Sequence, residues 1–164
     1  MTFQETKLVL LAADLAGFTR AAEQLAPLEV AALLDGWYRA IEAILGRHGG
    51  RVVKYMGDGC FATFPAGACA AATDAAAELW ALDRGATSGL AVGVNVHLGT
   101  VAEGEVAVGA DRRYDVFGGA VNHLFRMGGA GRLQISEAVY RELPEERRGQ
   151  WQAQPGSATY APAR

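Results

Sequence analysis

Cysteine is scarce in this sequence, and long apolar or basic runs are missing. The two cysteines, Cys60 and Cys69, form neither a CxxC pair nor another spacing typical of a metal site. They therefore indicate reduced, buried side chains of a cytoplasmic protein. The apolar run 8–13 is too short to cross a membrane, and no signal peptide is recognisable. No membrane partner is expected.

Positive charge is equally sparse. The net charge is −3, and the 15 lysine and arginine residues form no basic run, which argues against a nucleic-acid partner. No lysine follows Lys54, so a site for a polyanion must rely on a few individually placed cations. With 51% apolar residues in a length of 164, we expect one domain, residues 1–164, whose core needs neither disulfides nor a structural metal.

Apolar periodicity predicts strands that alternate with helices. Residues 7–13 are typical of a strand buried on both faces, with Thr19 as the N-cap of the following helix. Helical spacing of apolar residues extends from 27 to about 48. The other expected elements are hairpin strands 51–56 and 60–64, an alanine-rich helix 68–83, strands 90–98 and 102–108, a polar loop 109–114, a helix from 118 or 119 to 127, a strand 133–135, a short helix capped by Ser136, and weak strands near Trp151 and Tyr160. This order predicts an α+β fold, a ferredoxin-like α/β sandwich with a βαββαβ core, C-terminal additions and an antiparallel sheet with helices on one face.

Two carboxylates are placed to meet at one edge of that sheet. Asp14 ends the first strand, and Asp58 lies in the turn of the first hairpin. Mg²⁺ commonly takes one or two carboxylates together with phosphate oxygens, and a pair of such ions can activate a hydroxyl and neutralise a leaving phosphate. Taken singly, each aspartate also fits a structural role, at a helix start or in a turn.

Four further polar residues extend the pair to a nucleotide-handling set. Lys54 and Asp115 supply a donor and an acceptor that fit the ring nitrogen and exocyclic amine of adenine, although each also fits a solvated position. Asn122 and Arg126 are four residues apart, so one helix face carries both. The permanent charge and fork of arginine suit a pentavalent phosphorus. A surface pair on an amphipathic helix is the alternative for these two residues.

Three segments carry these residues: LAADLAGFT (11–19), RVVKYMGDGCFATF (51–64) and RRYDVFGGAVNHLFRM (112–127). In this order they resemble the catalytic domain of class III nucleotide cyclases, over about residues 7–140. The resemblance implies an adenylate cyclase that converts ATP to 3′,5′-cyclic AMP and pyrophosphate. It implies metal binding by Asp14 and Asp58 with the adjacent Leu15, triphosphate binding by Gly17, Phe18 and Thr19, adenine recognition by Lys54 and Asp115, ribose orientation by Asn122, and transition-state stabilisation by Arg126.

The resemblance also implies cofactors and a partner. Two Mg²⁺ or Mn²⁺ ions are expected in each site. In such cyclases the metal aspartates come from one subunit, whereas the base, ribose and transition-state residues come from the other. A homodimer with C2 symmetry would therefore build two complete sites from this chain, because it carries both halves.

Three positions depart from the family pattern. Gly93 stands where many members carry a phosphate-binding arginine, the C-terminal part has no lysine to contact the triphosphate, and Gly119 replaces a common acidic or amide residue. These departures affect phosphate binding more than chemistry, so weak ATP binding or slow turnover is expected.

Three alternatives to the adenylate cyclase remain open. A guanylyl cyclase would need an acidic residue at position 54 and a small or thiol residue at position 115. A catalytically silent dimerisation or nucleotide-binding module is favoured by the missing phosphate cations and opposed by the intact set of six residues. A diguanylate-cyclase relative would carry GGDEF or GGEEF at the hairpin, where this chain has MGDG.

Overall fold

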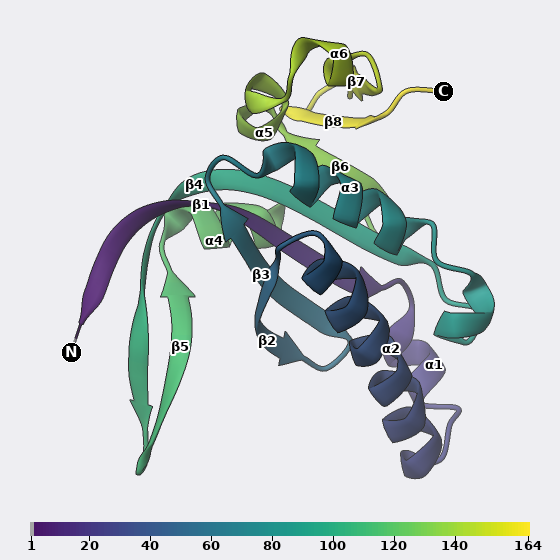
Figure 1. Cartoon of the computed structure of the whole chain (residues 1–164). Helices are drawn as coiled ribbons and strands as arrows, with labels where there is room; N and C mark the ends of the chain where they lie inside the picture. The colour runs from purple at the N-terminus through teal and green to yellow at the C-terminus, as the bar shows by residue number, and fades with distance from the viewer. Residues whose placement is uncertain (1) are drawn as a thin grey trace.

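The computed structural model describes residues 2–164, which form one open sheet covered by helices (Figure 1). The strands are β1 (Phe3–Leu15), β2 (Arg51–Met56), β3 (Gly59–Pro65), β4 (Val92–Val108), β5 (Asp111–Phe117), β6 (Leu133–Ser136), β7 (Trp151–Ala153) and β8 (Thr159–Pro162). The helices are α1 (Phe18–Ala22), α2 (Pro27–Arg47), α3 (Cys69–Trp80), the 3₁₀ helix η1 (Arg84–Thr87), α4 (Gly119–Arg126), α5 (Glu137–Glu142) and α6 (Glu145–Arg148).

The sheet has the strand order β2-β3-β1-β4-β6-β8-β7, and β5 pairs with the outer part of β4. Strand β1 lies between β3 and β4 and is antiparallel to both, whereas β4 and β6 are parallel. The first four strands with α2 and α3 reproduce the expected βαββαβ order. The predicted α+β fold class is confirmed.

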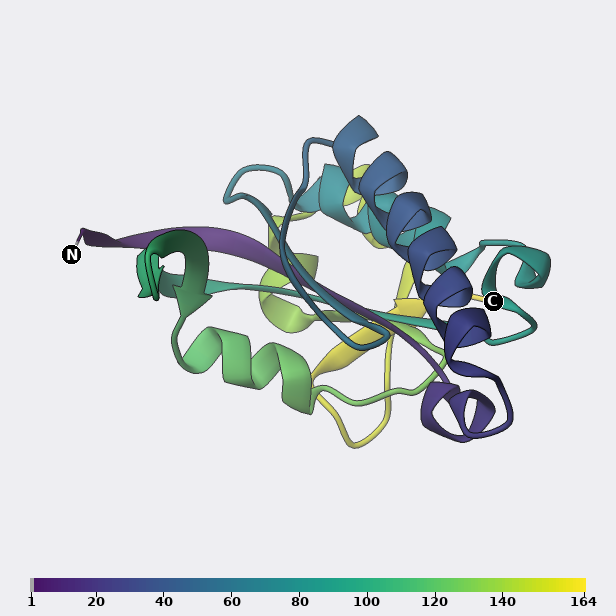
Figure 2. The same ribbon diagram turned by 90° about the horizontal axis from the view of Figure 1, so that it is seen from below.

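Helices pack on both faces of the sheet, which corrects the expectation of helices on one face only. Helices α2 and α3 cover one face and enclose the main core, which includes Trp37, Ile41 and Phe64. Helix α4 lies on the opposite face, as the view from below shows (Figure 2), where Leu124 packs with Leu10 and other residues in a second, smaller core. The second core brings the helix that carries Asn122 and Arg126 against β1 and β4.

The region 90–117 differs from the prediction. Strand β4 continues without a break from Val92 to Val108, and the segment predicted as a polar loop forms most of β5. Gly99 lies between the predicted strands 90–98 and 102–108, where a turn is expected, but it pairs with Leu8, and a Cβ there would lie 2.5 Å from Cβ of Ala120. Gly99 therefore permits the close approach of α4. The chain reverses instead near Gly109, at the end of the long projecting hairpin of β4 and β5 (Figure 1).

Most helix boundaries agree with the sequence. Helix α2 starts at Pro27, and the Ser136 hydroxyl accepts a hydrogen bond from Val139 N at the start of α5. The predicted N-cap at Thr19 is wrong, because α1 begins directly after Gly17, whose φ of 77° suits glycine. Helix α3 ends at Trp80, earlier than predicted, and η1 follows it.

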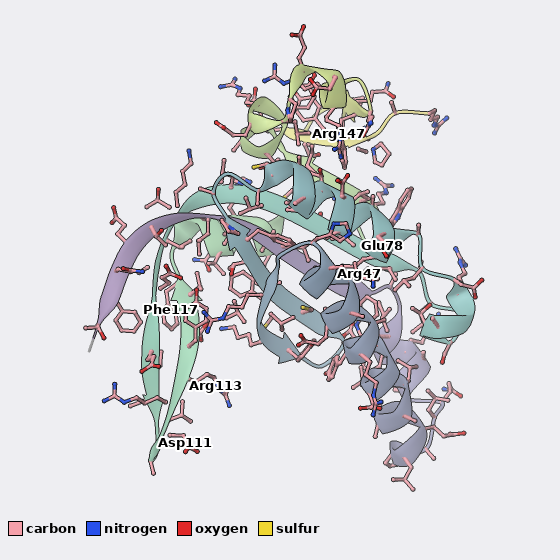
Figure 3. The ribbon with its side chains drawn as sticks, in the orientation of Figure 1. Arg47, Glu78, Asp111, Arg113, Phe117 and Arg147 are labelled. Carbon is pink, nitrogen blue, oxygen red and sulfur yellow. The ribbon has the colours of Figure 1, made fainter. Side chains whose placement is uncertain are left out.

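Two charged pairs connect the elements on the main face. Arg47 of α2 pairs with Glu78 of α3, and Arg147 of α6 pairs with Asp74 of α3 (Figure 3). The two weak C-terminal strands are present as β7 and β8. Among residues 2–164 no helix combines the length and the apolar character needed to span a membrane.

Candidate active site

Asp14 and Asp58 lie side by side where β1 ends. Asp14 is the penultimate residue of β1 and pairs with Gly93 of β4. Asp58 lies in the turn between β2 and β3, and its Oδ2 accepts a hydrogen bond of 2.9 Å from Leu15 N. The backbone next to Asp14 therefore fixes the carboxylate of Asp58, whereas metal binding by Leu15 stays a prediction.

Helix α2 holds the turn that carries Asp58. The buried Trp37 donates from Nε1 to the Asp58 carbonyl at 2.8 Å, and the Tyr38 hydroxyl donates to the Gly57 carbonyl. Gly57 has a φ of 61°, which the turn requires. Two adjacent residues of one helix thus fix the hairpin tip relative to β1.

The electrostatics of the carboxylate pair suit a cation. Loss of surrounding water and, to a smaller extent, the negative charge of Asp58 raise the pKa of Asp14 above its ordinary value. A divalent cation would remove this repulsion, and oxygen ligands are those that Mg²⁺ and Mn²⁺ prefer. Among residues 2–164 no cluster of three or more His, Cys, Asp or Glu side chains is arranged for a metal, so the protein would supply two carboxylates.

The segment Gly17–Thr19 follows the carboxylates directly. Gly17 has the positive φ of a turn, Phe18 packs against the main core, and Thr19 is exposed at the surface. The Gly17 carbonyl accepts from Ala21 N at 3.0 Å. The segment is therefore anchored by Phe18 beside Asp14, in the place where the sequence analysis puts the triphosphate.

Lys54 and Asp115 form an ion pair between β2 and β5. Lys54 Nζ lies 3.0 Å from both carboxylate oxygens of Asp115, and Asp115 Oδ1 also accepts from Val116 N at 2.8 Å. The side chains are 31% and 15% exposed, respectively. Phe117, labelled in Figure 3, places its ring 6.0 Å from Lys54 Nζ. Two residues 61 positions apart are thus brought together, as the predicted base-reading pair requires.

Asn122 lines the same cavity as Lys54, and Arg126 lies one turn further along α4. A cavity of about 600 Å³ is lined by Lys54, Phe117, Asn122 and Phe125, among other residues. Asn122 and Arg126 are both exposed, and Arg126 does not line the cavity. We call this space the base cavity.

The carboxylate pair borders a different cavity. Asp14 lines a space of about 230 Å³ together with Gly93, Asn95 and Phe125, which we call the Asp14 cavity. Lys54 and Asn122 do not line it, and Phe125 contributes to both cavities. One chain therefore presents the two predicted halves of the site separately.

Comparison with known proteins shows the family to which the chain belongs. The family model "Adenylate and Guanylate cyclase catalytic domain" matches residues 3–157. The chain belongs to this family. An adenylate cyclase of Anabaena cylindrica is 29% identical over 154 residues, which cover 84% of this chain and 31% of that protein. The chain spans a third or less of the length of the curated relatives it matches.

Solved structures of cyclase domains share the fold. The adenylyl cyclase CyaB from P. aeruginosa superposes with a TM-score of 0.84 at 19% identity, covering 100% of this chain and 97% of that one. The guanylyl cyclase Cya2 gives a TM-score of 0.77 at 21% identity, covering 99% and 93%. Both nucleotide specificities thus occur on this fold, so the base must be inferred from the residues of the site.

The structure adds residues to this cyclase domain that the sequence analysis did not select. Asn95 lines the Asp14 cavity and accepts a hydrogen bond of 3.3 Å from Gln134 Nε2 at its Oδ1. On the α4 face, His97 and His123 stack at 4.2 Å, and His97 Nδ1 lies 2.8 Å from Ser136 Oγ. These contacts join residues far apart in the sequence, and their residue types alone gave no signal. The run Gly128-Gly129-Ala130-Gly131 was visible in the sequence as a possible close-approach segment.

Proposed function

We propose that this cyclase domain is an adenylate cyclase, which forms 3′,5′-cyclic AMP and pyrophosphate from ATP. The ion pair between Lys54 and Asp115 is the observation that carries the proposal. An ammonium donor and a carboxylate acceptor, held together beside the base cavity, match the ring nitrogen and exocyclic amine of adenine. Guanine would require the opposite pattern of donors and acceptors at this place.

The remaining residues divide the reaction between them. Asn122 orients the ribose, the 3′-hydroxyl gives up its proton to water, and its oxygen attacks the α-phosphorus in line while the bond to the leaving pyrophosphate breaks. Arg126 stabilises the charge that develops on the phosphorus. Mg²⁺ or Mn²⁺ ions held by Asp14 and Asp58 would supply charge stabilisation for the attacking and leaving oxygens. Most of the catalytic effect is positioning, because little covalent chemistry falls to the protein.

A homodimer is part of the proposal. The Asp14 cavity and the base cavity are separate in one chain, so a complete site needs the carboxylates of one subunit opposite the base cavity of another. A C2 dimer supplies two such sites from identical chains. The exposed aromatic side chains Phe117 and Phe125, 43% and 46% exposed, border the base cavity and would become covered in the dimer.

The test is the cyclic product formed from each of the four nucleoside triphosphates at high protein concentration, with Mg²⁺ and then with Mn²⁺. We expect cyclic AMP to dominate and the Asp58→Ala variant to form none. A different dominant product would overturn the adenine assignment. No product with either metal would favour the silent module, which the scarcity of phosphate-binding cations supports.

A further inference from the structure

The segment Gly128–Gly131, here called the glycine loop, connects α4 to β6 and borders the Asp14 cavity. Gly128, Gly129 and Ala130 line that cavity together with Asp14. Among the described residues that line it, only Asp14 is charged, and no cationic side chain is available to a polyphosphate. The donors for such an anion must therefore come from the main chain.

The carbonyl groups of the glycine loop are turned into the protein. The Gly128 carbonyl accepts hydrogen bonds of 2.9 Å from both Asn95 Nδ2 and Gln134 Nε2. The Gly129 carbonyl accepts from Arg132 N at 2.9 Å, and the Gly131 carbonyl accepts from Trp80 Nε1 at 3.1 Å. Three of four carbonyls are thus fixed by donors of the protein, so the orientation of the loop is set before any ligand arrives.

The N–H groups of the same loop have no such partners. Within residues 2–164, the N–H groups of residues 128–131 donate no hydrogen bond. Three of these residues, Gly128, Gly129 and Gly131, have φ angles of 69°, 83° and 70°, and successive main-chain N–H groups in such conformations form anion-binding concavities. Gly128 and Ala130 are exposed beside the cavity, so their N–H groups are accessible to an anionic ligand.

Position 93 links the loop to the carboxylate pair. A Cβ there would lie 2.9 Å from Asp14 Oδ1 and 3.0 Å from Gly131 N. The Gly131 amide and the Asp14 carboxylate therefore lie close together, and only glycine at position 93 leaves room for both. A side chain at this position would displace one of them.

We propose that the main-chain N–H groups of the glycine loop bind the phosphate oxygens of the substrate, at the end that leaves as pyrophosphate. The inference deepens the proposed function, because it names the phosphate-binding element of the same site. Asn95 and Gln134 act as positioning residues, since they hold the Gly128 carbonyl and touch no phosphate themselves. The backbone donors take the place of the scarce lysine and arginine side chains.

Charge changes at Ala130 test the proposal, because this side chain is exposed and lines the cavity. Pyrophosphate binding is measured by calorimetry on the full chain with Mg²⁺. Ala130→Arg should tighten binding and Ala130→Asp should weaken it, each by about tenfold, because a charge within a few ångströms of the phosphates is only partly screened. Ala130→Gln controls for size. Ala110→Arg and Ala110→Asp, at the exposed hairpin turn, control for net charge and should change the affinity less than about twofold, since that turn borders neither cavity.

Amide resonances provide the direct readout. Titration with pyrophosphate should move the amide signals of Gly128, Gly129, Ala130 and Gly131, and adenosine should leave them in place. Unchanged loop signals during saturable pyrophosphate binding, or equal effects of charges at 130 and 110, would overturn the inference. Loop signals that move in a protein that forms no cyclic AMP would instead overturn the proposed function alone. Cyclic AMP formation that is insensitive to charge at position 130 would overturn the inference alone.

Discussion

Asp58 connects three parts of the candidate site through single contacts. Its carboxylate accepts from Leu15 N, next to Asp14, and its carbonyl accepts from Trp37 on α2. The position of one charged group is thus determined by a strand end and a helix together. A side chain with such fixed partners is preorganised, so little energy is needed to arrange it when a cation and a substrate bind.

A substitution of Arg126 tests whether this side chain stabilises the transition state more than it binds ATP. If it stabilises charge that develops only in the transition state, Arg126→Ala should lower kcat by about 100-fold or more and change ATP affinity little. The measurements are kcat for cyclic AMP formation and the dissociation constant of a non-cyclising ATP analogue. Arg20, exposed on α1, provides a matched control, because Arg20→Ala should leave kcat nearly unchanged. Equal losses in kcat and affinity would mean that Arg126 binds only the ground state.

The lowered pKa of His97 predicts that the free energy of unfolding depends on pH. Burial and the adjacent His123 lower the pKa of His97 from 6.5 to about 4. Between these values the unfolded chain binds a proton that the folded chain does not, so stability falls as pH falls from about 6.5 towards 4. We expect a loss on the order of 1–3 kcal/mol in the free energy of unfolding from this group.

Urea unfolding at pH 7 and pH 5 measures this effect. His97→Gln keeps a polar partner for Ser136 and removes the titration, so its free energy of unfolding should change less with pH than that of the unaltered protein. The prediction fails if both proteins lose equal stability between the two pH values.

Among the elements, α2 has a role beyond covering the sheet. Trp37 and Tyr38 hold the turn that carries Asp58, and Ile41, Ile44 and Leu45 of the same helix are buried in the main core. The position of the turn is therefore coupled to the packing of the helix. Changes within this helix should reach the metal site although no residue of α2 lines either cavity.

Trp37→Phe tests this coupling. It keeps an aromatic side chain in the core but removes the donor to the Asp58 carbonyl, and should destabilise the fold by about 1–3 kcal/mol. It should also weaken Mn²⁺ binding, measured with a non-cyclising ATP analogue, several-fold because the turn is less well held. Trp151→Phe, a similar change in β7, provides the control. Unaltered Mn²⁺ affinity in a folded Trp37→Phe protein would count against α2 as the support of the site.

The whole molecule presents the proposed metal-binding and base-binding residues beside two different cavities, lined by Asp14 and by Lys54 and Asn122, respectively. The proposed dimer therefore predicts that specific activity falls on dilution below the dimer dissociation constant. Mixing inactive Asp58→Ala with inactive Arg126→Ala should restore part of the activity, since a mixed dimer contains one intact site. Product formation in the mixture, compared with each variant alone at equal total concentration, is the measurement. An inactive mixture, with mixed dimers demonstrated by differently tagged chains, would contradict the shared site.

The sequence determined the order of most elements and predicted the six residues of the proposed site, because apolar periodicity and motif spacing are local properties. It could not decide between a turn and a close approach at Gly99, since glycine suits both, and the packing of α4 against β4 settled the matter. Nor could the sequence decide the partners of Asp58, the separation of the two cavities or the orientation of the glycine loop. Each depends on contacts between distant segments, which only the tertiary structure brings together.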